Sequence, residues 1–127
     1  MKFLTKLATI TTLALLMSNV HAASSASEHE ELRVQICSIA TSGIKIAATE
    51  RQAGKSKPAT KRKLDRELQE LSKNVKNQTF VNHITDTWYR GLDKVYQDPL
   101  LKTNEEKAVY ISTLTADAIV SCLSNIS

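Results

Sequence analysis

The chain has 127 residues, of which 42% are hydrophobic and 24% are charged, and its formal net charge is +4. Two of the positive charges, Lys2 and Lys6, lie in the first 22 residues, which contain no acidic residue, so the remainder carries only about two excess positive charges. Such a small excess does not indicate a partner selected by overall electrostatics, and we expect no nucleic-acid partner.

The first 22 residues have the features of a cleavable export signal. Lys2 and Lys6 precede an uncharged apolar run over residues 7–17, and small residues flank His21 before the expected cleavage after Ala22. The run is much shorter than the roughly 20 residues that span a bilayer as a helix, so we expect no transmembrane anchor. The expected destination is the periplasm, with secretion as the alternative.

After the signal, we expect a disordered lead-in over residues 23–27 and a single helical domain over residues 28–127. Ser27 to Glu30 has the Ser-x-x-Glu pattern of a capping box, which predicts a helix start. Apolar residues at helical spacing predict the buried face of this first helix: Leu32, Ile36, Ile39, Ala40, Gly43, Ile44 and Ala47. Gly54 and then Pro58 should end it.

The second predicted helix covers residues 59–74, where a narrow apolar stripe runs through a charged segment. Its stripe is Leu64, Leu68, Leu71 and Val75, and Asn74 and Asn77 predict a break. The third helix carries Phe80, Ile84, Trp88, Leu92, Val95 and Tyr96, and ends at Asp98-Pro99. Within it, Gly91 indicates a close approach by a neighbouring helix, and Trp88 is expected in the core.

A second capping box, Thr103 to Glu106, predicts the start of the last helix. Its expected buried residues are Ala108, Ile111, Leu114, Ala118, Ile119 and Cys122, followed by Leu123 and Ile126. Four helices with short connections predict an all-α fold, a small antiparallel four-helix bundle.

Cys37 and Cys122 are the only cysteines, and they lie in the first and last predicted helices. In an oxidising compartment an even count favours a disulfide, which here would close a loop of about 86 residues. Two unrelated buried thiols are the alternative. In an antiparallel bundle the two positions can lie level, so the predicted bridge and the predicted fold support each other.

Candidate chemistry is sparse, and we expect no catalytic residue, no metal site and no cofactor. His29 and His83 are the only histidines after the signal, and both methionines lie within it. The glutamate pairs 30–31 and 105–106 lie at helix starts, where the helix dipole already favours negative charge. The sequence has neither a Gly-x-Ser-x-Gly motif nor a phosphate-binding glycine loop.

Two surface features are candidate partner contacts. The first is a cluster of cations around the first predicted loop: Lys55, Lys57, Lys61, Arg62, Lys63 and Arg66. It fits a solvated face with Lys63–Glu67 and Arg66–Glu70 pairs, or a surface for an anionic lipid, polysaccharide or acidic protein. The second is Tyr89 with Arg90, which point away from the apolar stripe of the third helix.

Several short strings also form a recurring pattern: Cys37-Ser38-Ile39-Ala40, Arg51-Gln52-Ala53-Gly54, Tyr96-Gln97-Asp98-Pro99 and Ser121-Cys122-Leu123. The pattern resembles small exported helical proteins of Gram-negative bacteria and their phages, a family with no activity to carry over. In outline the chain is also similar to periplasmic immunity proteins that neutralise amidases delivered by type VI secretion. The cationic stretch 61–66 and Trp88-Tyr89-Arg90 depart from the first pattern.

The absence of recognisable chemistry in a disulfide-linked scaffold predicts a noncatalytic periplasmic protein-interaction module, such as an inhibitor or immunity-type protein. Its expected partner is another envelope or exported protein. The alternatives are a module that binds an anionic surface through residues 55–66 and a small cell-envelope enzyme whose groups are dispersed in the sequence.

Overall fold

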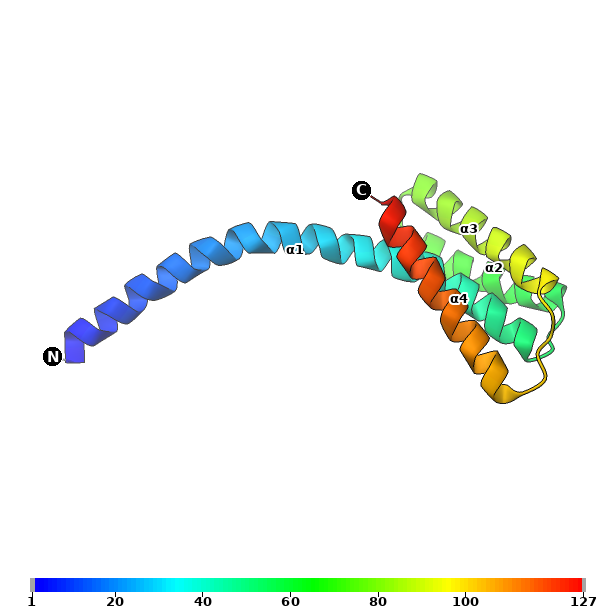
Figure 1. The fold of residues 1–127 in the computed structure, drawn as a ribbon. Helices are drawn as coiled ribbons and strands as arrows, with labels where there is room; N and C mark the ends of the chain where they lie inside the picture. Colours follow the sequence, from blue (N-terminus) through cyan, green and yellow to red (C-terminus); the bar gives the residue numbers. More distant parts are fainter. Residues whose placement is uncertain (1, 127) are drawn as a thin grey trace. The chain divides into compact units, whose positions relative to one another are not determined.

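The computed structural model describes residues 2–126, with side chains from residue 27 onward. Four helices follow one another in the chain: α1 (Lys2–Gln52), α2 (Lys57–Asn74), α3 (Gln78–Gln97) and α4 (Asn104–Asn125) (Figure 1). The chain divides into two units, Met1–Val34 and Gln35–Ser127. The first unit contains the beginning of α1, and the second contains the rest of α1 together with α2, α3 and α4.

The start of the first helix differs from the prediction. In the full-length chain α1 begins at Lys2, so Ser27 lies inside the helix and is not its N-cap. Residues 2–42 contain neither glycine nor proline, so the sequence offers no strong helix breaker before Ser27. Cleavage after Ala22 and the disordered lead-in over residues 23–27 concern a processed chain and stay predictions.

The turn between α1 and α2 forms as glycine and proline predict. Gly54 has a φ of 82°, and the amides of Gly54 and Lys55 donate to the carbonyls of Arg51 and Glu50, each at 3.0 Å. These two bonds are the Schellman pattern that ends a helix. Pro58 then lies in the first turn of α2, where its missing N–H costs no helical hydrogen bond.

Side-chain caps fix the starts of α3 and α4. Asn77 accepts a hydrogen bond from the amide of Phe80 at 3.1 Å, so the predicted break near Asn77 is also a helix start. Thr103 accepts from the amide of Glu106 at 3.1 Å, which confirms the predicted cap of the last helix. The Glu106 carboxylate accepts in return from the amide of Lys102, at 3.3 Å.

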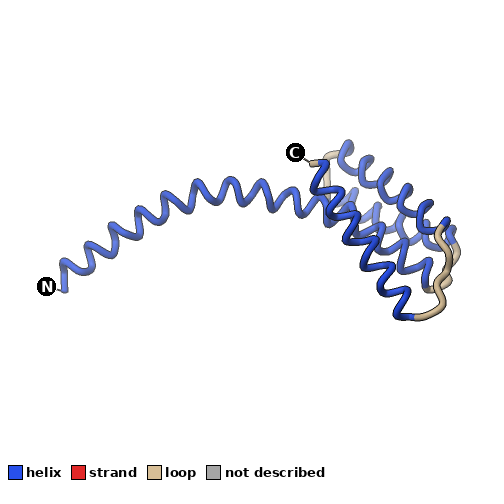
Figure 2. The backbone as a smooth tube through the Cα atoms, in the orientation of Figure 1, coloured by secondary structure: helices blue, strands red, loops and turns tan. Residues whose placement is uncertain are grey.

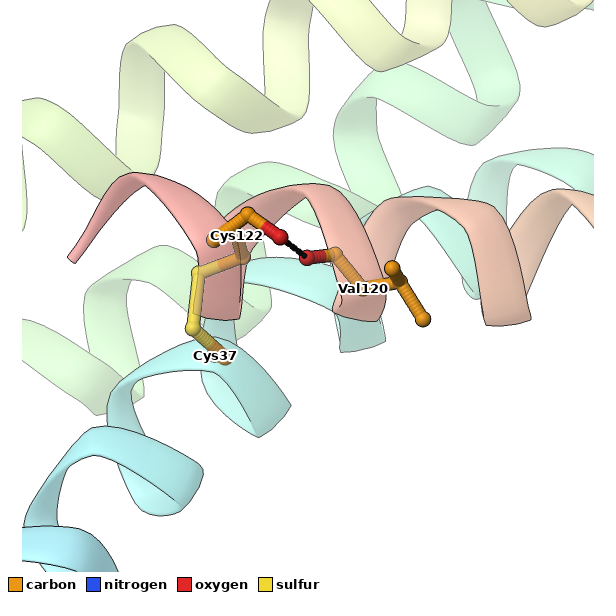
Figure 3. Close-up of a disulfide and its surroundings, with 4 residues drawn as sticks. Cys37, Val120 and Cys122 are labelled. Carbon is orange, nitrogen blue, oxygen red and sulfur yellow. Dashed lines mark hydrogen bonds between the residues drawn. A yellow bond between two sulfur atoms is a disulfide. The ribbon is translucent and has the colours of Figure 1, made fainter.

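Within the second unit, consecutive helices run in opposite directions, so the predicted antiparallel four-helix arrangement is confirmed (Figures 1 and 2). A disulfide joins Cys37 of α1 to Cys122 of α4, with 5.6 Å between their Cα atoms (Figure 3). The predicted bridge between the first and last helices is therefore confirmed. Such a bond indicates an oxidising, extracytoplasmic compartment.

The core lies between α1, α2 and α3, where the predicted apolar stripes meet. Its buried members are Ala40, Ala47, Ala48, Leu64, Leu68, Ile84, Trp88, Leu92 and Val95. Trp88 is only 4% exposed, as predicted. Leu32, which was predicted in the stripe of the first helix, belongs to the first unit and is 53% exposed.

The predicted burial of α4 is the main correction to the fold. None of its described residues is buried: Ala108 is exposed, and the other predicted residues from Ile111 to Ile126 are half-buried. Two depressions lined by residues of α1, α3 and α4 leave the side of α4 that faces α3 partly open. The helix rests on the core without being enclosed by it.

Candidate functional site

Internal ion pairs use half of the cationic cluster. Lys57 pairs with Asp93 of α3 at 2.7 Å, and Lys61 pairs with Asp65 at 3.1 Å. Lys63 reaches Glu50 at the end of α1, at 2.7 Å, and does not form the predicted pair with Glu67. The predicted Arg66–Glu70 pair is also absent from the described residues, since Glu70 pairs with Lys73 at 3.0 Å. Among the described side chains, Lys55, Arg62 and Arg66 form no ion pair.

The side chain of Tyr89 is half-buried and contacts α2. Its hydroxyl donates to the Asp65 carboxylate at 2.5 Å, and the Lys61 ammonium lies 4.8 Å from the centre of its ring. The hydrogen bond to Asp65, together with partial burial, raises the pKa of Tyr89. Arg90 is exposed and pairs with Asp86 on the same helix. Of the two predicted contact residues, only Arg90 lies largely free of the bundle.

These contacts also shift the pKa values of Asp65 and Lys61. Burial acts to raise the pKa of Asp65, but hydrogen bonds from Tyr89 and Lys61 outweigh it and leave the pKa lowered. The hydrogen bond with Asp65 is the main reason that the pKa of Lys61 is raised. Asp65, Lys61 and Tyr89 thus form one link between α2 and α3.

A second polar group, which the sequence analysis missed, binds the α3–α4 connection to the end of α1. Gln52 is 2% exposed, and its side chain donates to the carbonyl of Pro99 at 3.2 Å and accepts from the amide of Leu101 at 3.0 Å. Beside it, Arg51 donates to the carbonyl of Asp98 at 3.2 Å. The side chains of Arg51 and Gln52 hold residues 98–101 in place.

Two tyrosines complete this end of the bundle. Burial, strengthened by a hydrogen bond to Asp98 at 2.5 Å, raises the pKa of Tyr110 well above its usual range. Tyr96 donates to the carbonyl of Lys55 at 2.7 Å, and Thr60 shares a 2.7 Å hydrogen bond with the same hydroxyl. Tyr110 thus ties α4 to the α3–α4 connection at Asp98, and Tyr96 ties α3 to the α1–α2 turn at Lys55. These hydrogen bonds serve as structural contacts.

The outer side of α4 carries an exposed apolar surface. Val109 is 61% exposed and Val120 is 62% exposed, and Val120 lies two residues before the bridged Cys122 (Figure 3). A shallow depression of about 490 Å³ is lined by Ala116 and Ile119 of α4 and Lys45 of α1 among others. We call the surface of Val109, Ala116, Ile119 and Val120 the α4 face.

Charge is almost absent from this part of the chain. Between residues 108 and 126, Asp117 is the only charged residue. Exposed apolar side chains that stand singly are common on soluble proteins. Val109 and Val120 form a candidate interaction surface only together with the exposed Ala116 and the half-buried Ile119 that lie between them in the chain.

The second hollow lies on the side of α4 that faces α3. It consists of two adjoining depressions of about 370 Å³ and 270 Å³, which share Ile44 of α1 with Ala118 and Ser121 of α4. His83 and Thr87 of α3 border the larger one. We call the two together the α3–α4 groove.

Among the described residues, no group of three or more His, Cys, Asp or Glu side chains is placed to hold a metal ion. Nor is any helix of the described part long and apolar enough to cross a membrane. No protein-family model, curated protein or solved structure matches this chain.

Proposed function

We propose that this protein is a noncatalytic binding module that acts in the periplasm and holds another exported protein through the α4 face. The single observation that carries the proposal is the exposure of Val109 and Val120 on a helix that a disulfide fixes to the bundle. A rigid apolar helix face loses little conformational freedom on binding, which favours affinity. Binding without chemistry fits an inhibitor or immunity-type protein.

The nature of the α4 face sets the chemistry of the partner. Asp117 is the only charge between residues 108 and 126, and Glu105 and Glu106 lie beside Val109 at the margin of the face, so the complementary surface is mainly apolar and has few acidic groups. Association through such a surface depends on buried apolar area and should change little with salt. The alternative surface, residues 55–66, has less support, because Lys57, Lys61 and Lys63 are already paired within the domain.

A capture experiment with matched variants tests the proposal. The protein is produced with its own leader, recovered after export, immobilised, and exposed to periplasmic extract of the source cells. We expect a captured protein that remains bound at high salt, that is lost with Val109→Lys and Val120→Lys, and that is retained with Arg62→Glu and Arg66→Glu.

Opposite results would exclude this surface. Loss of the captured protein with the Arg62 and Arg66 variants, or on raising the salt concentration, would assign binding to the cationic cluster. Failure of the immobilised protein to hold any protein specifically would contradict the proposed function itself. Circular dichroism of each variant checks that the helices are intact.

A further inference from the structure

The α3–α4 groove has the size and the lining of a site for a small amphipathic molecule. Its two depressions, of about 370 Å³ and 270 Å³, together reach the range of small-molecule sites. Ile44 and Ala118 line both, and Val95 and Leu114 extend the apolar lining along the smaller one. Gly91 lies tightly against Ile44 at the wall of the smaller depression, since a Cβ there would lie 2.8 Å from Ile44 Cγ1.

One buried hydroxyl at this groove has no partner. Thr41 of α1 borders the larger depression and is only 4% exposed. Its Oγ1 forms no hydrogen bond with any described atom, whereas Thr49, Thr85 and Thr87 donate to the carbonyl four residues earlier. A buried hydroxyl without a hydrogen bond is costly. The Oγ1 atom is itself covered in the free protein, so a ligand that bonded to it after the Thr41 side chain turned toward the groove would remove an existing penalty.

The charges around the groove indicate the kind of head group. No Asp, Glu, Lys or Arg lines the larger depression, where Thr41, Ser121 and Asn125 supply neutral polar groups. Lys94 and Asp117 line only the smaller depression, and their charges have opposite signs. A neutral head that hydrogen-bonds therefore fits the Thr41 end better than an ionised one.

The length of the groove indicates the kind of tail. His83 borders one end and Gly91 the other, eight residues apart on α3, which corresponds to roughly 12 Å at the rise of an α-helix. An extended alkyl chain of medium length fills such a groove, whereas a compact ring system would leave much of it empty.

We propose that the α3–α4 groove binds a single-chain amphiphile whose uncharged polar head hydrogen-bonds to Thr41 and whose alkyl chain lies along Ile44 and Ala118 toward Leu114. The site is separate from the α4 face, because Ala118 lines the groove and Ala116 lines the depression on the outer side. The proposal therefore does not depend on the proposed partner-binding function.

The decisive variant is Thr41→Val, which removes the hydroxyl and keeps the shape of the side chain. The probe is monodecanoylglycerol, used below its micelle-forming concentration and titrated into the exported protein. Calorimetry and the fluorescence of Trp88, the only tryptophan, follow binding. We expect Thr41→Val to weaken binding about fivefold to tenfold, the value of one hydrogen bond, and to leave the unfolding temperature unchanged or higher.

A pair of substitutions on one helix supplies the control. Ala118→Leu fills the groove and should abolish binding of monodecanoylglycerol, whereas Ala116→Leu adds the same bulk outside the groove and should leave it intact. Decanoic acid, which has a similar chain and an ionised head, should bind at least fivefold more weakly, since no lysine or arginine lines the larger depression.

Four results would overturn the proposal. The first is no binding of monodecanoylglycerol to the unmodified protein, and the second is an unchanged affinity in Thr41→Val. The third is a lower unfolding temperature for Thr41→Val, which would show that the hydroxyl already has a partner in the free protein. The fourth is equal binding of decanoic acid. Whichever of these results is found, Thr41→Val should still capture the protein partner proposed for the α4 face. Failure of the groove proposal can therefore be told apart from failure of the proposed function.

Discussion

The indole ring of Trp88 lies directly on the backbone of Gly43, where a Cβ would approach its Cδ2 atom to 2.1 Å. From the same position the indole Nε1–H donates to the carbonyl of Ile39 at 3.1 Å. Both contacts join α3 to α1 near the buried side chain of Ile84. A glycine on one helix and the largest side chain of the other thus set how closely the two helices pack.

Gly43→Ala should destabilise the protein. The added methyl group overlaps the Trp88 ring, and overpacking of this kind typically costs about 1 to 3 kcal/mol. The better helix propensity of alanine returns roughly 1 kcal/mol, so the net loss is expected to lie in the lower part of that range. Urea unfolding followed by far-UV circular dichroism measures the difference.

Two further variants separate packing from helix propensity. Gly91→Ala gains the same propensity and meets Ile44 Cγ1 at 2.8 Å, but Ile44 is only half-buried and can move, so its loss should be smaller. Gly43→Ala combined with Trp88→Phe should show a coupling, because the smaller ring vacates part of the space that the methyl needs. Equal stability of Gly43→Ala and the unmodified protein would contradict this account.

The sequence predicts the features that depend on one helix at a time. The stripes of α2 and α3, the αL glycine at residue 54, and the cap at Thr103 follow from local periodicity and from side-chain chemistry, and the structure confirms each. The close approach predicted at Gly91 is also confirmed, because glycine inside a helix costs stability unless a neighbour requires it.

Apart from the disulfide and the contact at Gly91, features that need two or more helices were predicted less well. Spacing along α2 suggested a Lys63–Glu67 pair, yet Glu50 from the end of α1 takes the ammonium. Apolar spacing in α4 suggested full burial, but burial depends on neighbours, and α4 has the groove on one side and an exposed face on the other. The role of Gln52 depends on loop carbonyls and amides, which leave no mark in a sequence pattern.

The link between α2 and α3 predicts an acid-sensitive part of the stability. The pKa of Asp65 is lowered in the folded state, because hydrogen bonds from Tyr89 and Lys61 outweigh burial. Its contribution is therefore fully present above the unfolded pKa, near 3.9, and is lost as the pH falls through the folded pKa. The Asp65 side chain is 40% exposed, so solvent reduces the contribution to about 0.5 to 1 kcal/mol.

Asp65→Asn tests this contribution. The variant should be less stable than the unmodified protein at neutral pH, and the gap should narrow as the pH falls below about 4. Tyr89→Phe removes one of the two hydrogen bonds and should show a smaller effect of the same sign. The measurement is the free energy of unfolding by urea at pH 7 and at pH 3. Parallel stability curves for Asp65→Asn and the unmodified protein would show that this carboxylate does not contribute.

The disulfide should matter more to α4 than to the other helices. It joins residues 85 positions apart, a loop for which the chain-entropy model gives roughly 4 to 5 kcal/mol. No described residue of α4 is buried, and only half-buried side chains such as Ile111 and Leu114 pack against the core, so α4 has less apolar contact than α2 and α3 to hold it once the bond is broken. In contrast, α2 and α3 bury Leu64, Leu68 and Trp88 against α1 and should remain associated.

Hydrogen exchange of the reduced protein, or of the double variant Cys37→Ala with Cys122→Ala, measures this difference helix by helix. Amides of residues 108–125 should lose protection first, while those of α2 and α3 remain protected until the whole domain unfolds. Because the proposed α4 face requires an ordered α4, capture of the partner should fall in parallel with this protection. If all four helices lost protection together, the bond would stabilise the bundle as one unit, and the idea of an α4 held chiefly by Cys122 would have to be given up.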